Sequence, residues 1–250
     1  TLTDADTTGV DLSGADLQEA TLVEADLTEA TLAETLLVRA DLTAATLDET
    51  DLSTVDATDA TLADASLVAA DLGGSTLDGS DLAGVTAREA TLTDASLRRV
   101  TLTDADLSEA ALTQATLTGG DLSGATLASA DLTDAVAADA TASDASLADA
   151  TATAADFAGT TFDGARLSRA DLRRADLTDA DLTAADCDET TFTAATVDGA
   201  VFTDAVVEEA TFDDATLQRA DLAGVDLSTA TLDGCRLVGA ELSRANLHGV

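Results

Sequence analysis

The chain has 250 residues, with eleven basic and forty-nine acidic side chains, and its formal net charge is −38. Lys, Ile, Met, Trp, Tyr and Pro are absent, and five Phe residues are its only aromatic side chains. This composition excludes an ordinary mixed globular domain, and the charge argues against direct binding to nucleic acid. No apolar run approaches the roughly 18 residues that a membrane span requires, so we expect no membrane association.

A period of five residues runs without insertion from Thr1 to Val250. If the central residue of each pentapeptide is called i, Leu occupies 36 of the fifty i positions, and all five Phe residues are also at i. Position i−2 is Ala in 36 pentapeptides, and position i−1 is Asp in 19 and Thr in 19. Positions i+1 and i+2 are mostly polar, Gly or Ala.

This pattern does not fit a helix, because five residues at 100° each would move the apolar pair around the whole cylinder. It fits a short extended segment in which i−2 and i point inward and i−1 points outward. The two residues that follow must turn the chain, and Gly and Asp at i+2 tolerate such turns. Repeated segments and turns predict a solenoid.

Three of the pentapeptides show the repeat most clearly: Ala15–Glu19, Ala25–Glu29 and Ala175–Asp179. They resemble the A-(D/N)-L-x-x motif of the pentapeptide repeat family. The resemblance covers the whole chain and implies an all-β fold, a right-handed quadrilateral parallel β-helix with four pentapeptides per coil. At twenty residues per coil, residues 1–250 would form about 12 coils in a single continuous domain.

The spacing of Asp supports a twenty-residue coil. Asp side chains stacked about 4.8 Å apart would repel each other by about 0.9 kcal/mol in water. At position i−1, Asp pairs separated by 5, 10, 15 or 25 residues occur seven times each, whereas pairs separated by 20 occur three times. We therefore expect residues twenty apart to be stacked.

The inward positions predict how the rarer residues are used. We expect the Phe side chains to fill the core, with Phe192 directly below Phe212. Cys187 and Cys235 are also inward, but they are more than two coils apart, too far for a disulfide. We expect two buried free thiols, which are compatible with a cytoplasmic location. The Phe residues are Phe157, Phe162, Phe192, Phe202 and Phe212.

Charged side chains offer little material for catalysis or for metal binding. The single histidine, His248, is expected to be exposed near the end of the chain. Carboxylate pairs such as Asp4 and Asp6, Asp104 and Asp106, or Asp186 and Asp188 lack the loop spacing of dedicated calcium sites. We therefore predict no catalytic, cofactor or metal residues and no cofactor. A small arginine group is expected to pair with Asp171 and Asp176; its members are Arg166, Arg169, Arg173 and Arg174.

These observations favour a noncatalytic rod that serves as a scaffold or protein-interaction module, with an unknown protein partner. Its acidity, its abundant Asp and Thr and its lack of Lys resemble proteins adapted to concentrated salt. The alternative is mimicry of DNA, because some acidic members of the pentapeptide repeat family occupy the DNA-binding surface of a type II topoisomerase such as DNA gyrase. No capping element is visible at either end, so we expect a fragment, a processed chain, or ends that are closed by end-to-end association with another copy.

Overall fold

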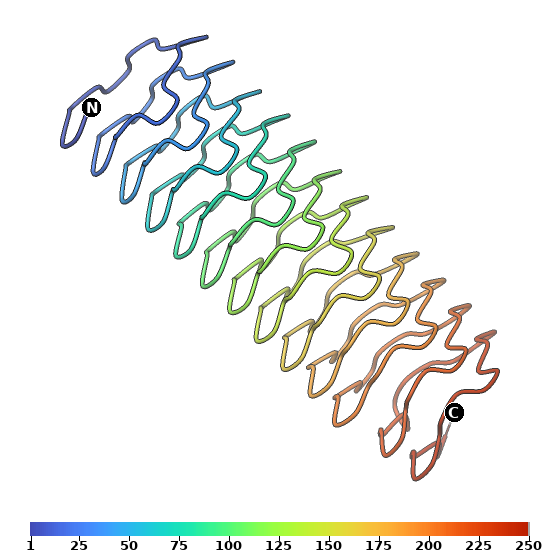
Figure 1. The fold of residues 1–250 in the computed structure, drawn as a ribbon. Helices are drawn as coiled ribbons and strands as arrows, with labels where there is room; N and C mark the ends of the chain where they lie inside the picture. Colours follow the sequence, from blue (N-terminus) through green and yellow to red (C-terminus); the bar gives the residue numbers. More distant parts are fainter. Residues whose placement is uncertain (250) are drawn as a thin grey trace.

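A computed structural model describes residues 1–249 as an elongated stack of coils with the two termini at opposite ends (Figure 1). No helix and no extended strand occur in this range. Residues at position i−1 instead form isolated parallel β-bridges between successive coils, from Asp6↔Asp26 to Asp226↔Asn246. Every bridge joins residues twenty apart, so one coil contains four pentapeptides and the expected stacking register is confirmed.

The spacing of Asp follows this register. Bridges between two Asp residues occur three times, as the sequence count predicts: Asp6↔Asp26, Asp51↔Asp71 and Asp156↔Asp176. Most other Asp residues at i−1 are bridged to Thr or Ser, which places an uncharged side chain between carboxylates. The alternation of Asp with uncharged residues at position i−1 therefore limits electrostatic repulsion between neighbouring coils.

Backbone hydrogen bonds between coils follow one scheme. The Leu22 and Glu24 amides donate to Asp41 and Thr43 carbonyls of the next coil at 2.7 and 3.0 Å, and the Asp41 amide donates back to the Ala20 carbonyl at 2.9 Å. Between consecutive pentapeptides of one coil, the amide at i−2 donates to the carbonyl of the preceding i residue and closes the turn. Four of the five amides are thereby satisfied, and the amide at i+1 is left for another partner.

The turn requires a left-handed backbone at position i+2. Every i+2 residue from Asp4 to Gly249 has a positive φ, with the single exception of Thr229. Many of these residues are Glu, Asp, Arg or Ala rather than Gly, although the left-handed conformation costs a residue with a Cβ about 1–2 kcal/mol. The bonds between coils must offset that cost.

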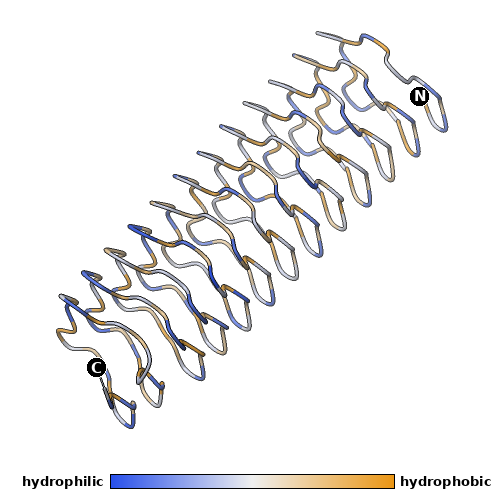
Figure 2. Ribbon diagram, turned by 180° about the vertical axis from the view of Figure 1, so that it is seen from behind, coloured by the Kyte–Doolittle hydropathy of each residue, from blue (hydrophilic) through white to orange (hydrophobic). Residues whose placement is uncertain are grey.

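The core is a continuous column of Leu at i and Ala at i−2. These side chains are almost fully buried from Leu22 to Leu227, whereas Leu2 and Leu242 in the terminal coils are only partly buried. Burying a Leu side chain contributes roughly 1.5–3 kcal/mol. Figure 2 shows the resulting alternation of hydrophobic and hydrophilic residues around every coil, with no separate apolar region.

The Phe residues fill this column as predicted. Phe192 and Phe212 stack with ring centroids 4.7 Å apart and an interplanar angle of 3°, and Phe202 packs edge-on against both rings. Phe157 and Phe162 form a second edge-to-face pair, with centroids 5.3 Å apart. All five side chains are buried.

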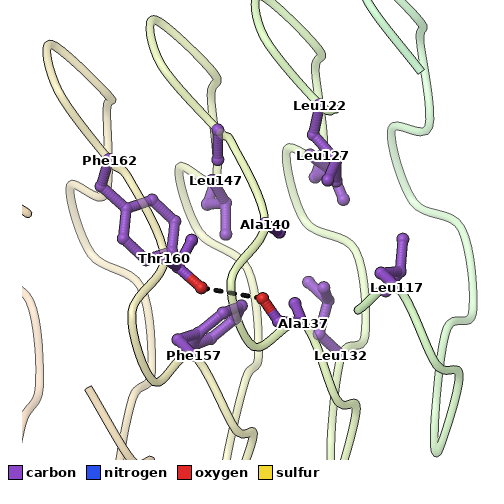
Figure 3. A pocket seen from close by; sticks show the side chains of 11 residues that line it. Leu117, Leu122, Leu127, Leu132, Ala137, Ala140, Leu147, Phe157, Thr160 and Phe162 are labelled. Carbon is purple, nitrogen blue, oxygen red and sulfur yellow. Dashed lines mark hydrogen bonds between the residues drawn. The ribbon is translucent and has the colours of Figure 1, made fainter. Parts of the chain in front are cut away.

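The second Phe pair compensates for missing leucines. Ala137 and Ala142 occupy i positions, and the residues one coil further on are Phe157 and Phe162. Their rings extend toward the space above the two alanines and leave an apolar void of about 10 Å³ (Figure 3). A void of this size is at the lower limit for a single water molecule, and its largely apolar lining offers few hydrogen-bond partners.

Threonines at inward positions donate to carbonyls of neighbouring coils. Thr7, the one polar residue at i, donates to the Asp26 carbonyl at 2.9 Å. Thr160 at i−2 donates to the Ala137 carbonyl at 2.8 Å, also drawn in Figure 3. Such bonds remove the cost of burying a hydroxyl group. The other threonines that bond in this way are Thr35, Thr50 and Thr190.

One β-bridge of the regular series is missing near the C-terminal end, and we call this interruption the open rung. Among the described residues, Val206 and Asp226 form no bridge with each other, and the amides of Val207 and Asp226 have no backbone acceptor. The Glu209 amide donates to the Thr229 hydroxyl at 3.0 Å instead of to a backbone carbonyl. The interruption coincides with Thr229, which does not adopt the left-handed turn. Val206, at an outward position, is 44% exposed.

Candidate functional site: the outer surface

Asp at position i−1 caps the backbone amide at i+1 of its own pentapeptide. The Asp51 carboxylate accepts hydrogen bonds from the Ser53 amide at 3.0 Å and from the Ser53 hydroxyl at 2.6 Å. All 19 Asp residues at i−1 make the bond to the amide, and Asn246 makes it to His248. These carboxylates accept the hydrogen bond of the i+1 amide, which is the one amide without a backbone acceptor. A large share of the acidic side chains therefore has a structural role.

A second arrangement caps the same amide from the coil below. The Asp48 carboxylate, at position i+1, accepts from the Val68 amide at 3.0 Å and from the Ser66 hydroxyl at 2.5 Å. Asp78 does the same for the Arg98 amide at 2.9 Å and the Ser96 hydroxyl at 2.6 Å. Two further carboxylates cap amides in this way: Asp198 for Gln218 and Asp213 for Asp233.

These caps change the titration of several carboxyl groups. The hydroxyl and amide of Ser13 lower the pKa of Asp11, and those of Thr28 lower the pKa of Asp26. Ser228 lowers the pKa of Asp226, with a further contribution from Asn246. The capped side chains therefore favour the charged state in which they serve as acceptors.

The arginine group forms different ion pairs from those predicted. Arg173 pairs with Asp171, as expected, with an Nη2–Oδ2 distance of 2.5 Å. Arg169 pairs with Asp149 of the coil below through two bonds of 2.7 Å, and this contact lowers the pKa of Asp149. The prediction that Asp176 would pair with this group is wrong, because its carboxylate caps Thr178.

The carboxylate pairs singled out in the sequence have separate structural tasks. Asp106 caps Ser108, whereas the Asp104 carboxylate lies against Gly124 of the next coil. Asp186 accepts a hydrogen bond from the Asp188 amide at 3.2 Å. Within residues 1–249, no three His, Cys, Asp or Glu side chains converge in a way that could hold a metal ion.

The cysteines and the histidine lie where the repeat places them. Both thiols are free, as predicted, and burial raises the pKa of the Cys187 thiol, which keeps it protonated. Cys235 is only partly buried, contrary to expectation, because it belongs to the terminal coils where the core is incomplete. His248 is exposed, as predicted.

The interior leaves little room for a ligand, so the candidate functional groups are those on the outer surface. It presents carboxylates, Thr and Ser hydroxyl groups and a few arginines along the length of the rod. No helix in the described part of the chain is long and apolar enough to cross a membrane. Sequence reasoning missed the capping role of Asp, although its fixed place two residues before i+1 could have indicated an Asx turn.

Comparison with known proteins agrees with this architecture. The family described as "Pentapeptide repeats (8 copies)" matches residues 1–32, 35–74, 65–104, 105–141, 130–174 and 145–183, and "Pentapeptide repeat region" matches residues 165–242. No curated protein sequence matches the chain significantly.

Two solved structures are similar. HetL, a pentapeptide repeat protein involved in regulation of heterocyst differentiation in the cyanobacterium Nostoc sp. strain PCC 7120, is 32% identical, with 81% of this chain and 86% of HetL covered and a TM-score of 0.36. A trypsin-treated variant of QnrB1, a plasmid-mediated fluoroquinolone resistance protein, is 19% identical, with 71% and 83% covered and a TM-score of 0.51. The likeness to QnrB1 supports a right-handed β-helix. By the extent of the family match, this chain belongs to the pentapeptide repeat family.

Proposed function

We propose that the protein is a noncatalytic rod that acts as a scaffold or protein-interaction module. The observation that carries this proposal is the filled interior, whose Leu–Ala column leaves a void of only about 10 Å³. The side chains that remain to meet other molecules are outward ones on a long, regular surface. Repeat proteins commonly use such extended surfaces to bind other proteins.

Site-specific crosslinking can test this role. A photoreactive residue would replace one outward residue per variant, for instance at Thr61, Thr151 or Thr216, and crosslinked proteins would be identified after irradiation in cells. We expect one defined protein to be captured from a subset of positions. Equal recovery of unrelated abundant proteins from every position would contradict a dedicated interaction surface.

We further propose that the acidity adapts the rod to a salt-rich cytoplasm. The net charge of −38 and the absence of Lys support this, because at 1 M ionic strength charges are screened within about 3 Å. The capping carboxylates add a second reason for Asp, so acidity and fold are linked. The free thiols at Cys187 and Cys235 are compatible with a reducing compartment.

The second candidate function is mimicry of DNA toward a type II topoisomerase, with DNA gyrase as the partner. It is favoured by the anionic rod and by the similarity to QnrB1, which is a fluoroquinolone resistance protein. A supercoiling assay with purified gyrase, with and without fluoroquinolone and at several salt concentrations, tests it. Unchanged supercoiling and unchanged drug sensitivity at micromolar protein would remove this candidate.

The architecture that we propose to support either role is a quadrilateral β-helix of about twelve coils. We also propose end-to-end association of copies, since Leu2 and Leu242 in the two outermost coils are only partly buried. Analytical ultracentrifugation over a range of concentrations tests this. A sedimentation coefficient that stays at the monomer value throughout would contradict association.

A further inference from the structure

Four of the eleven arginines lie within nine residues of one another, and the last two of them border a hollow. The hollow has a volume of about 330 Å³ and is lined by Arg173, Arg174, Thr193 and Ala194. Arg173 turns toward Asp171 of its own coil, to which its Nε and Nη2 donate. Arg174 makes no ion pair within the described residues, so its guanidinium donors remain available.

A backbone amide at the hollow also lacks an acceptor. Thr193 is at position i+1, and its amide forms no hydrogen bond among the described residues. Neither of the two capping arrangements can operate there, because position i−1 of this pentapeptide is Thr191 and the residue one coil below is Arg173. At this pentapeptide an arginine, and not a carboxylate, lies one coil below the uncapped amide.

The i+1 amides of two other coils show which group can accept a hydrogen bond at this position. At Val68 and at Arg98, a carboxylate from the coil below accepts the i+1 amide together with the hydroxyl at i−1. Thr191 is the i−1 residue of the same pentapeptide as Thr193 and carries a hydroxyl, and Arg174, which lines the hollow, adds a cationic donor. Amide, hydroxyl and guanidinium donors around one position form a set suited to a carboxylate.

We propose that this hollow, lined by Arg173, Arg174, Thr193 and Ala194, is a binding site for a carboxylate from outside the chain, with the Thr191 hydroxyl of the same pentapeptide as a further donor. The ligand takes the position that Asp48 holds beneath Val68, accepting from the Thr193 amide and the Thr191 hydroxyl while Arg174 neutralises its charge. This inference rests on the proposed interaction role and specifies the chemistry of the contact: the ligand is an aspartate or glutamate side chain presented by a partner.

The neighbouring coils keep this position open. The residues directly below and above Arg174 are Ala154 and Ala194, so no acidic side chain lies next to it in its own stack. Arg169, by contrast, has Asp149 directly below and pairs with it. In a chain with forty-nine acidic residues, the small uncharged neighbours leave Arg174 available for an external anion.

The test is an NMR titration of isotopically labelled full-length protein, followed through its backbone amides. The probes are acetate and a capped tripeptide with one aspartate between two glycines, and the matched control is the same tripeptide with asparagine. We expect both carboxylates to shift the Thr193 amide in a saturable way. The Val68 amide, which already has Asp48 as its acceptor, should not move.

Two variants locate the binding. Arg174→Ala should weaken binding by roughly tenfold, because a charge-assisted hydrogen bond is lost. Arg173→Asp should abolish it, since the new carboxylate can cap Thr193 from below as Asp48 caps Val68. Arg88→Asp is the matched control: it makes the same change of charge at i+1, but the amide above it, that of Ser108, is already capped by Asp106.

Circular dichroism establishes that the variants retain the fold. The proposal is overturned if Thr193 does not respond to either carboxylate, if the asparagine peptide shifts it equally, or if Arg88→Asp abolishes binding as Arg173→Asp does. Binding of acetate without binding of the aspartate peptide would overturn a partner side chain as the source of the carboxylate. None of these outcomes depends on which protein the rod binds, so the proposed function is tested separately.

Discussion

The backbone of Gly84 lies so close to Asp64, one coil below, that a Cβ on the glycine would be 2.6 Å from the Asp64 Oδ1 atom. The same relationship recurs along the rod, with Asp at a turn followed by Gly twenty residues later. The carboxylate thus occupies the space in which the next turn would carry a side chain. Comparable pairs are Asp59 with Gly79, Asp139 with Gly159, Asp144 with Gly164 and Asp214 with Gly234.

This contact predicts that Gly84→Ala destabilises the rod. Two effects add: the left-handed φ of +66° and the clash with Asp64. Gly224→Ala is the control, since Gly224 has a φ of +79° but nothing within 4 Å of the added Cβ. We expect about 1–2 kcal/mol from the backbone effect alone and a larger loss for Gly84→Ala, measured by denaturant unfolding. Equal losses would show that Asp64 simply moves aside.

The capping role of Asp predicts that Asp51→Ala costs more than an ordinary surface substitution. Its loss leaves the Ser53 amide without a protein acceptor, which should lower the free energy of unfolding by about 1 kcal/mol. Thr61→Ala is the control, because Thr61 is also at i−1 but caps no amide. A difference of less than a few tenths of a kcal/mol between the two variants would argue that water replaces the cap fully.

The same caps predict loss of stability in acid. The pKa values of Asp11, Asp26 and Asp226 are lowered in the folded protein, so each contributes stability above its unfolded pKa near 3.9 and loses it as pH falls through the lower folded value. Unfolding measured from pH 6 to pH 2 should therefore show declining stability below about pH 4. NMR titration of the Asp226 carboxyl should give a midpoint below that of Asp in a model peptide.

The core predicts that Phe162 and Ala142 are coupled. Phe162→Ala should cost about 3–5 kcal/mol because it enlarges the void, and Ala142→Leu alone should cost about 1–3 kcal/mol through overpacking. The double variant Ala142→Leu with Phe162→Leu should be less destabilised than the sum of Ala142→Leu and Phe162→Leu. Thermal unfolding of the three leucine variants measures this coupling, and strict additivity would mean that the two sites do not share the void.

Low salt should loosen the rod. Screening shortens to about 3 Å at 1 M ionic strength, whereas in dilute buffer the acidic side chains of successive coils repel one another. We expect both β content and melting temperature, followed by circular dichroism, to rise from dilute buffer to molar salt. The same values throughout would show that the charges are already balanced within the fold.

The sequence predicts the register well and the outer surface less well. The five-residue period and the rarity of Asp pairs twenty apart were enough to place Phe192 under Phe212, because inward positions have no alternative once the coil length is fixed. The pairing of Arg169 with Asp149 was not predicted, although both occupy the same turn column. A long arginine side chain can reach several acids, and the choice depends on side-chain conformations that a periodic pattern does not encode.

The open rung at Val206 and Asp226 is a further feature that the period conceals. It coincides with the absence of a left-handed turn at Thr229, and the same residue type does adopt that turn at Thr54. A residue's identity therefore does not determine the conformation of its turn.

Each Asp at i−1 satisfies an amide only two residues away, so this cap stays within its own pentapeptide, whereas the other backbone amides bond to neighbouring coils or to the preceding pentapeptide. A gene encoding such a protein can lengthen or shorten by whole twenty-residue units while every surviving module keeps its own cap. Duplication and deletion would then adjust the reach of the molecule without redesigning its interior. Carboxylates that cap an amide of the next coil, such as Asp48, are the exception, because such a cap is kept only if both coils are kept.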